Sequence, residues 1–247
     1  MTFDQHEFDI RCEWGEQGVS ALAPVSDVVI IVDVLSFSTS VDIAVSQGAI
    51  VFPYPWRDDT ASAYAVSVGA ELADPERNRS GYSLSPASLT SIPQGTRLVL
   101  PSPNGSALTL AAKPTPVLAG CFRNARAVAS AASQYGRKIA VIAAGERWRG
   151  DDSLRPSFED LIGAGAIIEC LIGRQSPEAI MAAAAFRGVG AEIGQWLRQC
   201  SSGKELIRRG FESDVTLASR QNTSDCAPVL VNDAYVRAEA QEQAGVE

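Results

Sequence analysis

Acidic side chains in this chain stand where apolar, strand-like segments end or a helix begins. The four acids in such places are Asp33, Glu146, Glu159 and Asp160. Ligands bind outside the carboxyl ends of strands in open α/β sheets, because only the loops there reach solvent. Carboxylate oxygens are the ligands that a hard divalent cation prefers. These four residues are therefore the candidate ligands of a metal ion such as Mg²⁺.

A cluster of hydroxyl side chains follows Asp33. Ser36, Ser38 and Thr39 open a predicted helix directly after the strand that Asp33 ends. Hydroxyls and free backbone amides at a helix N-terminus suit a phosphate or a sulfonate. An ordinary helix cap by Ser36 or Ser38 explains the same residues and is the more common arrangement. The cluster is a candidate substrate-binding segment.

Two further strand ends carry groups that suit an anion. Asn104-Gly105-Ser106 joins a predicted strand to a predicted helix, and Asn-Gly tolerates the positive φ of a tight turn that presents its amides. Arg147 follows Glu146 and offers a guanidinium to a phosphate. The alternative for Asn104-Gly105-Ser106 is an ordinary turn, and the alternative for Glu146 and Arg147 is a pair of charges on a surface loop. We assign Asn104 and Arg147, with Asp33, to the catalytic set.

Glu159 and Asp160 have a structural explanation as well. Ser157 precedes Asp160 by three residues, which resembles a capping box with Asp in place of Glu or Gln. Acids in a first helical turn are also favoured by the helix dipole. Both roles, metal ligand and helix cap, stay open for these two acids.

The segments that must position these residues alternate between strand and helix patterns. The predicted strands are residues 28–32, 49–52, 97–100, 116–118 and 139–143, and the predicted helices are 38–47, 60–68, 106–112, 125–135, 158–172 and 177–184. This alternation predicts a three-layer α/β/α fold with a mixed, largely parallel sheet, and two similar halves are an alternative organisation within it. We treat residues 1–247 as one α/β unit whose two-lobed arrangement has no visible boundary. The acidic stretch 239–247 is expected to fray.

Composition excludes several classes of protein. Lys and Arg number 21 against 29 Asp and Glu, for a net charge of −8, which argues against a nucleic-acid partner. A single histidine, His6, excludes most histidine-based chemistry. Five widely spaced cysteines predict reduced thiols and a cytoplasmic location, and no apolar stretch is long enough to span a membrane. A homo-oligomer is the usual state of a soluble enzyme.

Taken in order, the segments resemble the 2-phosphosulfolactate phosphatase family. The resemblance spans about residues 28–230 and rests on Val32-Asp33-Val34-Leu35 with Ser38-Thr39, Glu76-Arg77, Ser85-Pro86, Asn104-Gly105-Ser106, Arg123-Asn124-Ala125, Gly145-Glu146-Arg147, the run from Glu159 to Gly165, and the run from Gly210 to Val215. It implies a Mg²⁺-dependent enzyme of the coenzyme M route that hydrolyses (2R)-2-phospho-3-sulfolactate. It also implies that Gly105, Ser106, Arg123 and Asn124 join the substrate-binding set. Water and the Asp33 carboxylate are alternative attacking groups.

The chain departs from the family pattern at two places. The family has an arginine where this chain has Ser36, and Gly-Asn-Ser-Pro where this chain has Ser83-Leu84-Ser85-Pro86. The first change removes a planar, permanently charged group from an anion-binding loop. We expect sulfonate recognition to depend on a compensating arginine, with Arg123, Arg147 and Arg187 as the candidates. The alternative functions are a phosphatase for another small anionic phosphomonoester and a non-catalytic binder of small anions.

Overall fold

One mixed sheet forms the centre of the structure. The structure is a computed structural model, and it describes residues 3–55, 58–77 and 81–238. Within these residues the order of the sheet's nine strands is β1-β7-β2-β6-β10-β11-β3-β5-β4. The strands are β1 (Ile10–Trp14), β2 (Val28–Val32), β3 (Ile50–Tyr54), β4 (Glu71–Leu72), β5 (Arg97–Pro101), β6 (Val117–Ala119), β7 (Ile139–Ala143), β10 (Pro228–Val231) and β11 (Ala234–Arg237). A separate small sheet pairs β8 (Glu146–Arg147) with β9 (Leu154–Arg155).

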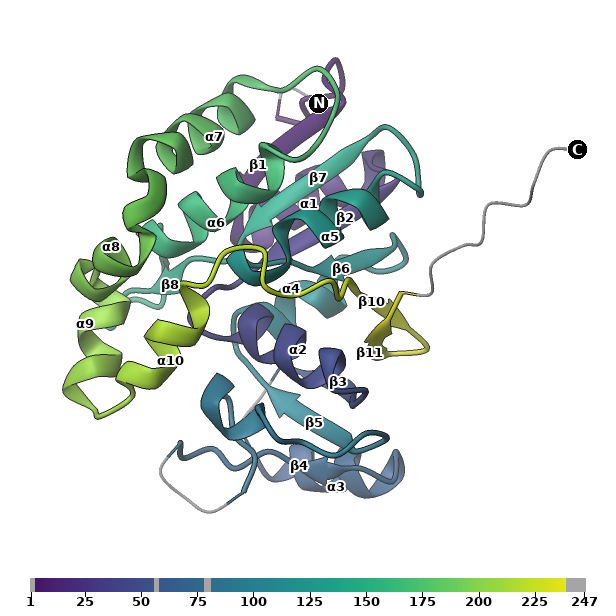
Figure 1. Cartoon of the computed structure of the whole chain (residues 1–247). Helices are drawn as coiled ribbons and strands as arrows, with labels where there is room; N and C mark the ends of the chain where they lie inside the picture. Colours follow the sequence, from purple (N-terminus) through teal and green to yellow (C-terminus); the bar gives the residue numbers. More distant parts are fainter. Residues whose placement is uncertain (1–2, 56–57, 78–80, 239–247) are drawn as a thin grey trace, which may run out of the picture.

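Helices cover both faces of this sheet, as Figure 1 shows. They are α1 (Gly15–Leu22), α2 (Phe37–Ser46), α3 (Asp59–Ser67), α4 (Gly105–Ala111), α5 (Ala125–Ala132), α6 (Phe158–Ile168), α7 (Pro177–Val189), α8 (Ile193–Gln199), α9 (Ser201–Arg208) and α10 (Glu212–Ala218). In β2, Val28, Ile30 and Val32 pack with α5, α6 and α7, whereas Val29 and Ile31 pack with α1, α2 and α4. The strand is fully buried because both faces are covered, which explains its continuous apolar run. The predicted α/β/α fold is confirmed.

The parallel strands form two groups that a hairpin joins. Neighbours are parallel within β1-β7-β2-β6 and within β3-β5-β4, while β10 and β11 pair antiparallel with each other and with β6 and β3. The hairpin has one register pair with each group, Val229 with Leu118 and Tyr235 with Val51. In Figure 1 the arrowheads of β7 and β5 point to the same side of the molecule. The carboxyl ends of the two groups therefore meet.

Several elements differ from the sequence prediction. β1 was missed because Arg11 and Glu13 interrupt its apolar pattern. Arg11 is nevertheless fully buried, and its guanidinium donates to the carbonyl oxygens of Phe8 and Val25. The hairpin β10–β11, α1 and α8 were also missed, and α6 ends at Ile168 rather than at residue 172. The stretch 239–247 lies outside the described residues.

Two features of the described part of the chain bear on the class of protein. The cysteines Cys12, Cys121, Cys170, Cys200 and Cys226 are free thiols there, as their spacing predicted. Among the described helices, none is long and apolar enough to cross a membrane.

Candidate active site

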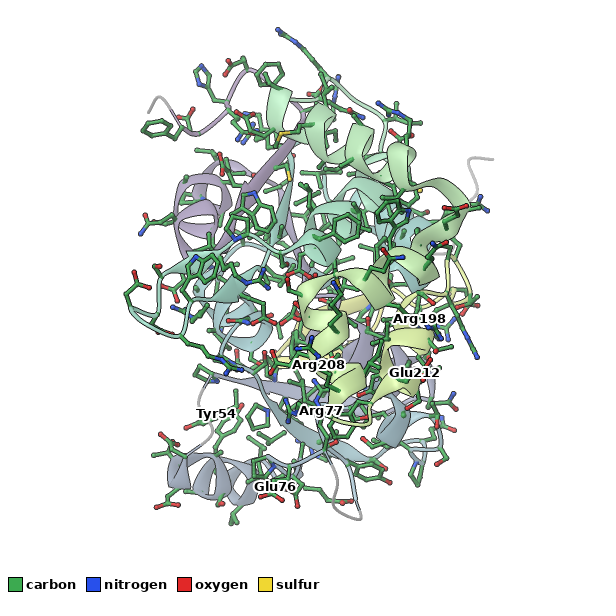
Figure 2. All side chains as sticks on the ribbon, turned by 90° about the vertical axis from the view of Figure 1, so that its left-hand side faces the viewer. Tyr54, Glu76, Arg77, Arg198, Arg208 and Glu212 are labelled. Carbon is green, nitrogen blue, oxygen red and sulfur yellow. The ribbon has the colours of Figure 1, made fainter. Side chains whose placement is uncertain are left out.

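A cavity of about 250 Å³ lies where the carboxyl ends of the two strand groups meet. Its walls come from the loops after β2, β5 and β7, from the segments around Pro75 and Leu84, and from one face of α9. The residues that line it are Asp33, Leu35, Ser36, Pro75, Arg77, Leu84, Ser102, Pro103, Asn104, Glu146, Ser202, Glu205, Leu206 and Arg209. Figure 2 views the molecule from the side of α8, α9 and α10, where the labelled Arg77 lies close to these helices.

Asp33 is held rigidly at this cavity. Its Oδ1 accepts a hydrogen bond from the Phe37 amide at 3.2 Å, and its Oδ2 accepts one from the Gly105 amide at 3.0 Å. The pKa of Asp33 is raised to about 6, mainly by burial and also by the charge of Glu159, while the two amide hydrogen bonds and Arg77 act in the opposite direction. The loops after β2 and β5 are thus joined through one carboxylate.

Glu146 lines the same cavity. Its Oε2 accepts a hydrogen bond from Asn104 Nδ2 at 3.3 Å. Burial raises the pKa of Glu146 to about 7, and the charges of Asp33 and Glu159 raise it as well. β2 and β7 are neighbouring parallel strands with Val32 opposite Ala143, which brings the two carboxylates to one edge of the sheet. Their mutual repulsion opposes the ionisation of both groups, and a bound cation would remove that penalty.

Asp160 and Glu159 have other surroundings. Asp160 Oδ1 accepts from the Val34 amide at 2.8 Å, and its Oδ2 accepts from the Gly145 amide at 2.8 Å and from Ser157 Oγ at 2.8 Å. Asp160 therefore ties together the loops that carry Asp33 and Glu146, rather than forming the expected capping box. Burial raises its pKa well above the usual range. Glu159 is buried and lines an adjacent cavity with Arg155 and Trp196.

The donor set of the cavity suits an oxygen-preferring cation. Asp33, Glu146 and Asn104 supply two carboxylates and an amide oxygen. In the described residues, no three His, Cys, Asp or Glu side chains are grouped so that they would hold a metal ion. Mg²⁺ is commonly bound by one or two carboxylates together with waters and substrate phosphate. The residues present thus fit Mg²⁺, with Asp33 and Glu146 rather than all four acids at the cavity.

Of the three hydroxyl residues after Asp33, one lines the cavity and two bond to the main chain. Ser36 lines the cavity. Ser38 and Thr39 are fully buried, and their hydroxyls donate to the carbonyl oxygens of Ile31 and Val34. Ser38 Oγ also accepts from the Asp33 amide at 3.0 Å. These two hydroxyls fix the loop that carries Asp33, which differs from both expected roles, helix cap and anion ligand.

The three residues of the Asn104-Gly105-Ser106 turn also have different contacts. Asn104 faces the cavity, the Gly105 amide is taken by Asp33, and the buried Ser106 hydroxyl donates to the Leu100 carbonyl at 2.9 Å. Gly105 is needed for close packing, since a Cβ there would lie 2.2 Å from Phe37 Cδ1. The turn holds Asp33 in place and presents one side chain, Asn104.

The predicted arginines lie elsewhere. Arg123 Nε donates to the fully buried Asp42 at 2.8 Å, and Asn124 bonds to the main chain at Cys121 and Ala119. Arg147 pairs with Glu16 at 2.6 Å and with Asp152 at 3.3 Å. It lines a second cavity, which shares Asn104 and Glu146 with the first. The structure therefore does not bring Arg123, Asn124 or Arg147 to the cavity of Asp33.

Two arginines that sequence reasoning did not assign lie there instead. Arg77 donates from Nη2 to Ser36 Oγ at 3.0 Å and from Nη1 to the fully buried Asp214 at 2.7 Å. Arg209 lines the cavity from the end of α9. Arg77 and Asp214 are separated by 137 residues, so no local pattern could have paired them. A sequence pattern could have indicated that α9 contributes to the cavity. The helical spacing of the residues that line it places them on one face of a helix: Ser202, Glu205, Leu206 and Arg209.

A small cavity lined by carboxylates and arginines, at the carboxyl ends of strands in an α/β sheet, is the place where α/β proteins bind small polar ligands. The sequence profile of the family described as 2-phosphosulpholactate phosphatase matches residues 18–233. The chain therefore belongs to the 2-phosphosulfolactate phosphatase family, a family of phosphoric monoester hydrolases.

Two relatives have the same description. A protein of Methanothermobacter thermautotrophicus named 2-phosphosulfolactate phosphatase is 28% identical over 212 residues, which cover 83% of this chain and 87% of that protein. A protein of Gloeobacter violaceus named probable 2-phosphosulfolactate phosphatase is 31% identical over 96 residues, which cover 39% of this chain and 38% of that protein.

Proposed function

We propose that this protein hydrolyses (2R)-2-phospho-3-sulfolactate to 3-sulfolactate and phosphate in a Mg²⁺-dependent reaction. The observation that carries the proposal is the meeting of Asp33, Glu146 and Asn104 at one cavity, in a chain that the family profile matches over residues 18–233. The names of the two relatives support the substrate. The donor set of the cavity supports the metal.

Asp33 and Glu146 are the residues that would hold the cation. When bound, Mg²⁺ would neutralise the charge of the phosphate and orient the attacking water. Both oxygens of Asp33 already accept amide hydrogen bonds, which fixes the carboxylate in one orientation. A carboxylate held in this way is suited to binding a cation, so we favour water over Asp33 as the attacking group.

Asn104 is the residue that would contact the phosphoryl group. Its Nδ2 carries two hydrogens, of which one is donated to Glu146. The other is available to a phosphoryl oxygen, where negative charge is concentrated during the transfer. Three further groups act indirectly. Asp160 and Ser38 hold the loops of the site in place, and the Gly105 amide holds the Asp33 carboxylate.

Phosphate release from a panel of phosphomonoesters tests this function. The panel contains phosphosulfolactate, phospholactate and a sugar phosphate, each assayed with Mg²⁺ and with a chelator. We expect Mg²⁺-dependent release from phosphosulfolactate at the highest kcat/KM of the three. A higher kcat/KM for another ester would assign a different substrate, and the absence of release from all three would favour a small-anion binder.

A further inference from the structure

The cavity that contains the two carboxylates also contains two guanidinium groups. Arg77 and Arg209 both line it. Their Cζ atoms lie 5.8 and 5.6 Å from the centre of the same aromatic ring, that of Phe211. Burial lowers the pKa of Arg77, and the charge of Arg209 lowers it as well, because two like charges at one cavity repel. A bound anion would remove that repulsion.

The two arginines are held to different degrees. Arg77 is mostly buried, and its partner Asp214 also accepts from Ser85 Oγ at 2.6 Å and from the Ala87 amide at 3.2 Å. Arg209 is more than half exposed, and its Nη1 lies 3.8 Å from Glu205 Oε1, beyond the range of a good hydrogen bond. Arg77 is thus a fixed guanidinium, and Arg209 is one that a ligand can draw in.

Ser36 adds a donor beside Arg77. Its Oγ accepts a hydrogen bond from Arg77 Nη2, which leaves the hydroxyl hydrogen available for a ligand. The three arginines expected to compensate are all paired elsewhere: Arg123 with Asp42, Arg147 with Glu16 and Arg187 with Glu169. Arg77 is the guanidinium that contacts Ser36.

We propose that Arg77, Arg209 and the Ser36 hydroxyl form a second anion site, which binds the sulfonate of a substrate whose phosphate lies at Asp33 and Glu146. This inference rests on the proposed function and adds the residues that determine specificity. A guanidinium presents several N–H donors in one plane and stays charged at all working pH values, which suits a permanently ionised sulfonate.

The test compares two substrates and two neighbouring arginines. Arg209→Gln removes the charge that lines the cavity, and Arg208→Gln makes the same change one residue earlier, at an exposed side chain that does not line it. Phosphosulfolactate and phospholactate differ in the sulfonate alone. We expect Arg209→Gln to lower kcat/KM for phosphosulfolactate by roughly tenfold or more, the size of one lost charge-assisted hydrogen bond, and to leave phospholactate within about threefold. Arg208→Gln should change neither value by more than about twofold.

Other outcomes overturn the inference. Equal losses with both substrates would mean that Arg209 acts on the phosphate or on folding, and a thermal melt of each variant separates those two. Unchanged kcat/KM for phosphosulfolactate would remove Arg209 from the site. If the wild type hydrolyses neither ester, the proposed function fails, and calorimetric binding of 3-sulfolactate and of lactate to wild type and Arg209→Gln tests the site alone. Binding without preference for the sulfonate, or without dependence on Arg209, would contradict it.

Discussion

Asn104 and Ser106 are two residues apart, yet one faces a cavity and the other faces the main chain. Asn104→Ala removes the donor to Glu146 and, in the proposed mechanism, the donor to the phosphoryl group. We expect kcat to fall by about a hundredfold, the scale of one lost preorganised donor, with little change in stability. Ser106→Ala removes a buried hydrogen bond to Leu100 and should cost about 1 kcal/mol of stability while kcat is retained.

Steady-state kinetics and urea unfolding of the two variants check this contrast. If Asn104→Ala loses stability while its folded fraction turns over normally, the side chain is structural. The phosphate would then have to be contacted by other residues of the cavity.

The raised pKa of Glu146 predicts a pH-dependent stability in the metal-free protein. A carboxyl whose folded-state pKa is about 7 keeps its proton in the folded protein at pH values where the unfolded chain has lost it. Its contribution is present below the unfolded pKa and is lost as the pH rises through about 7. Glu146→Gln removes that loss, since Gln stays neutral.

In chelator, Glu146→Gln should therefore be more stable than wild type at pH 8 by about 1–3 kcal/mol and nearly equal to it at pH 4. Urea unfolding at the two pH values measures the difference. A variant that gains nothing at pH 8, or gains as much at pH 4, would show that Glu146 is not held in this unfavourable environment.

At the scale of elements, α10 holds Arg77, which lines the cavity, through one buried carboxylate. Asp214 is fully buried and accepts hydrogen bonds from Arg77, Ser85 and the Ala87 amide, so it joins α10 to these three residues. Asp214→Asn leaves Arg77 with an uncompensated charge. We expect a loss of roughly 3–5 kcal/mol, as for other broken buried ion pairs.

The control lies in the same helical turn. Glu212 pairs with Arg198 at the surface, where Figure 2 shows both side chains, and Glu212→Gln should cost less than about 1 kcal/mol. Chemical denaturation of both variants gives the comparison. Similar losses in the two variants would mean that Asp214 does not connect the segments.

The elements that carry acids at strand ends were predictable because each has a local pattern. β2 and β7 are continuous apolar runs, and this pattern alone placed Asp33 and Glu146 after parallel strands. The pairing of Arg77 with Asp214 was not predictable, since it depends on contacts between distant segments. The sequence also did not predict that Ser38, Thr39 and Ser106 are buried. A serine or threonine whose hydroxyl bonds to the main chain cannot be told from the sequence apart from one whose hydroxyl contacts a ligand.

At the scale of the whole molecule, two groups of parallel strands bring different chemistry to one cavity. The β1-β7-β2-β6 group supplies Asp33 and Glu146, and the β3-β5-β4 group supplies Asn104. The amide of Gly105 bonded to Asp33 joins the two groups directly at the site. Sequence patterns predicted the layers of this fold, whereas the hairpin that joins the groups went unrecognised, although its Asn232-Asp233 turn, with both residues at positive φ, is typical of a tight hairpin.

The Mg²⁺ dependence of phosphosulfolactate hydrolysis, measured on wild type and on Asp33→Asn in parallel, tests the central claim most directly. Wild type should release phosphate in proportion to bound Mg²⁺ and stop when the metal is chelated. Asp33→Asn, checked for folding by circular dichroism, should lose at least about a hundredfold in kcat/KM. Hydrolysis that continues in chelator, or a folded Asp33→Asn variant that keeps its activity, would contradict a metal-dependent reaction at this cavity.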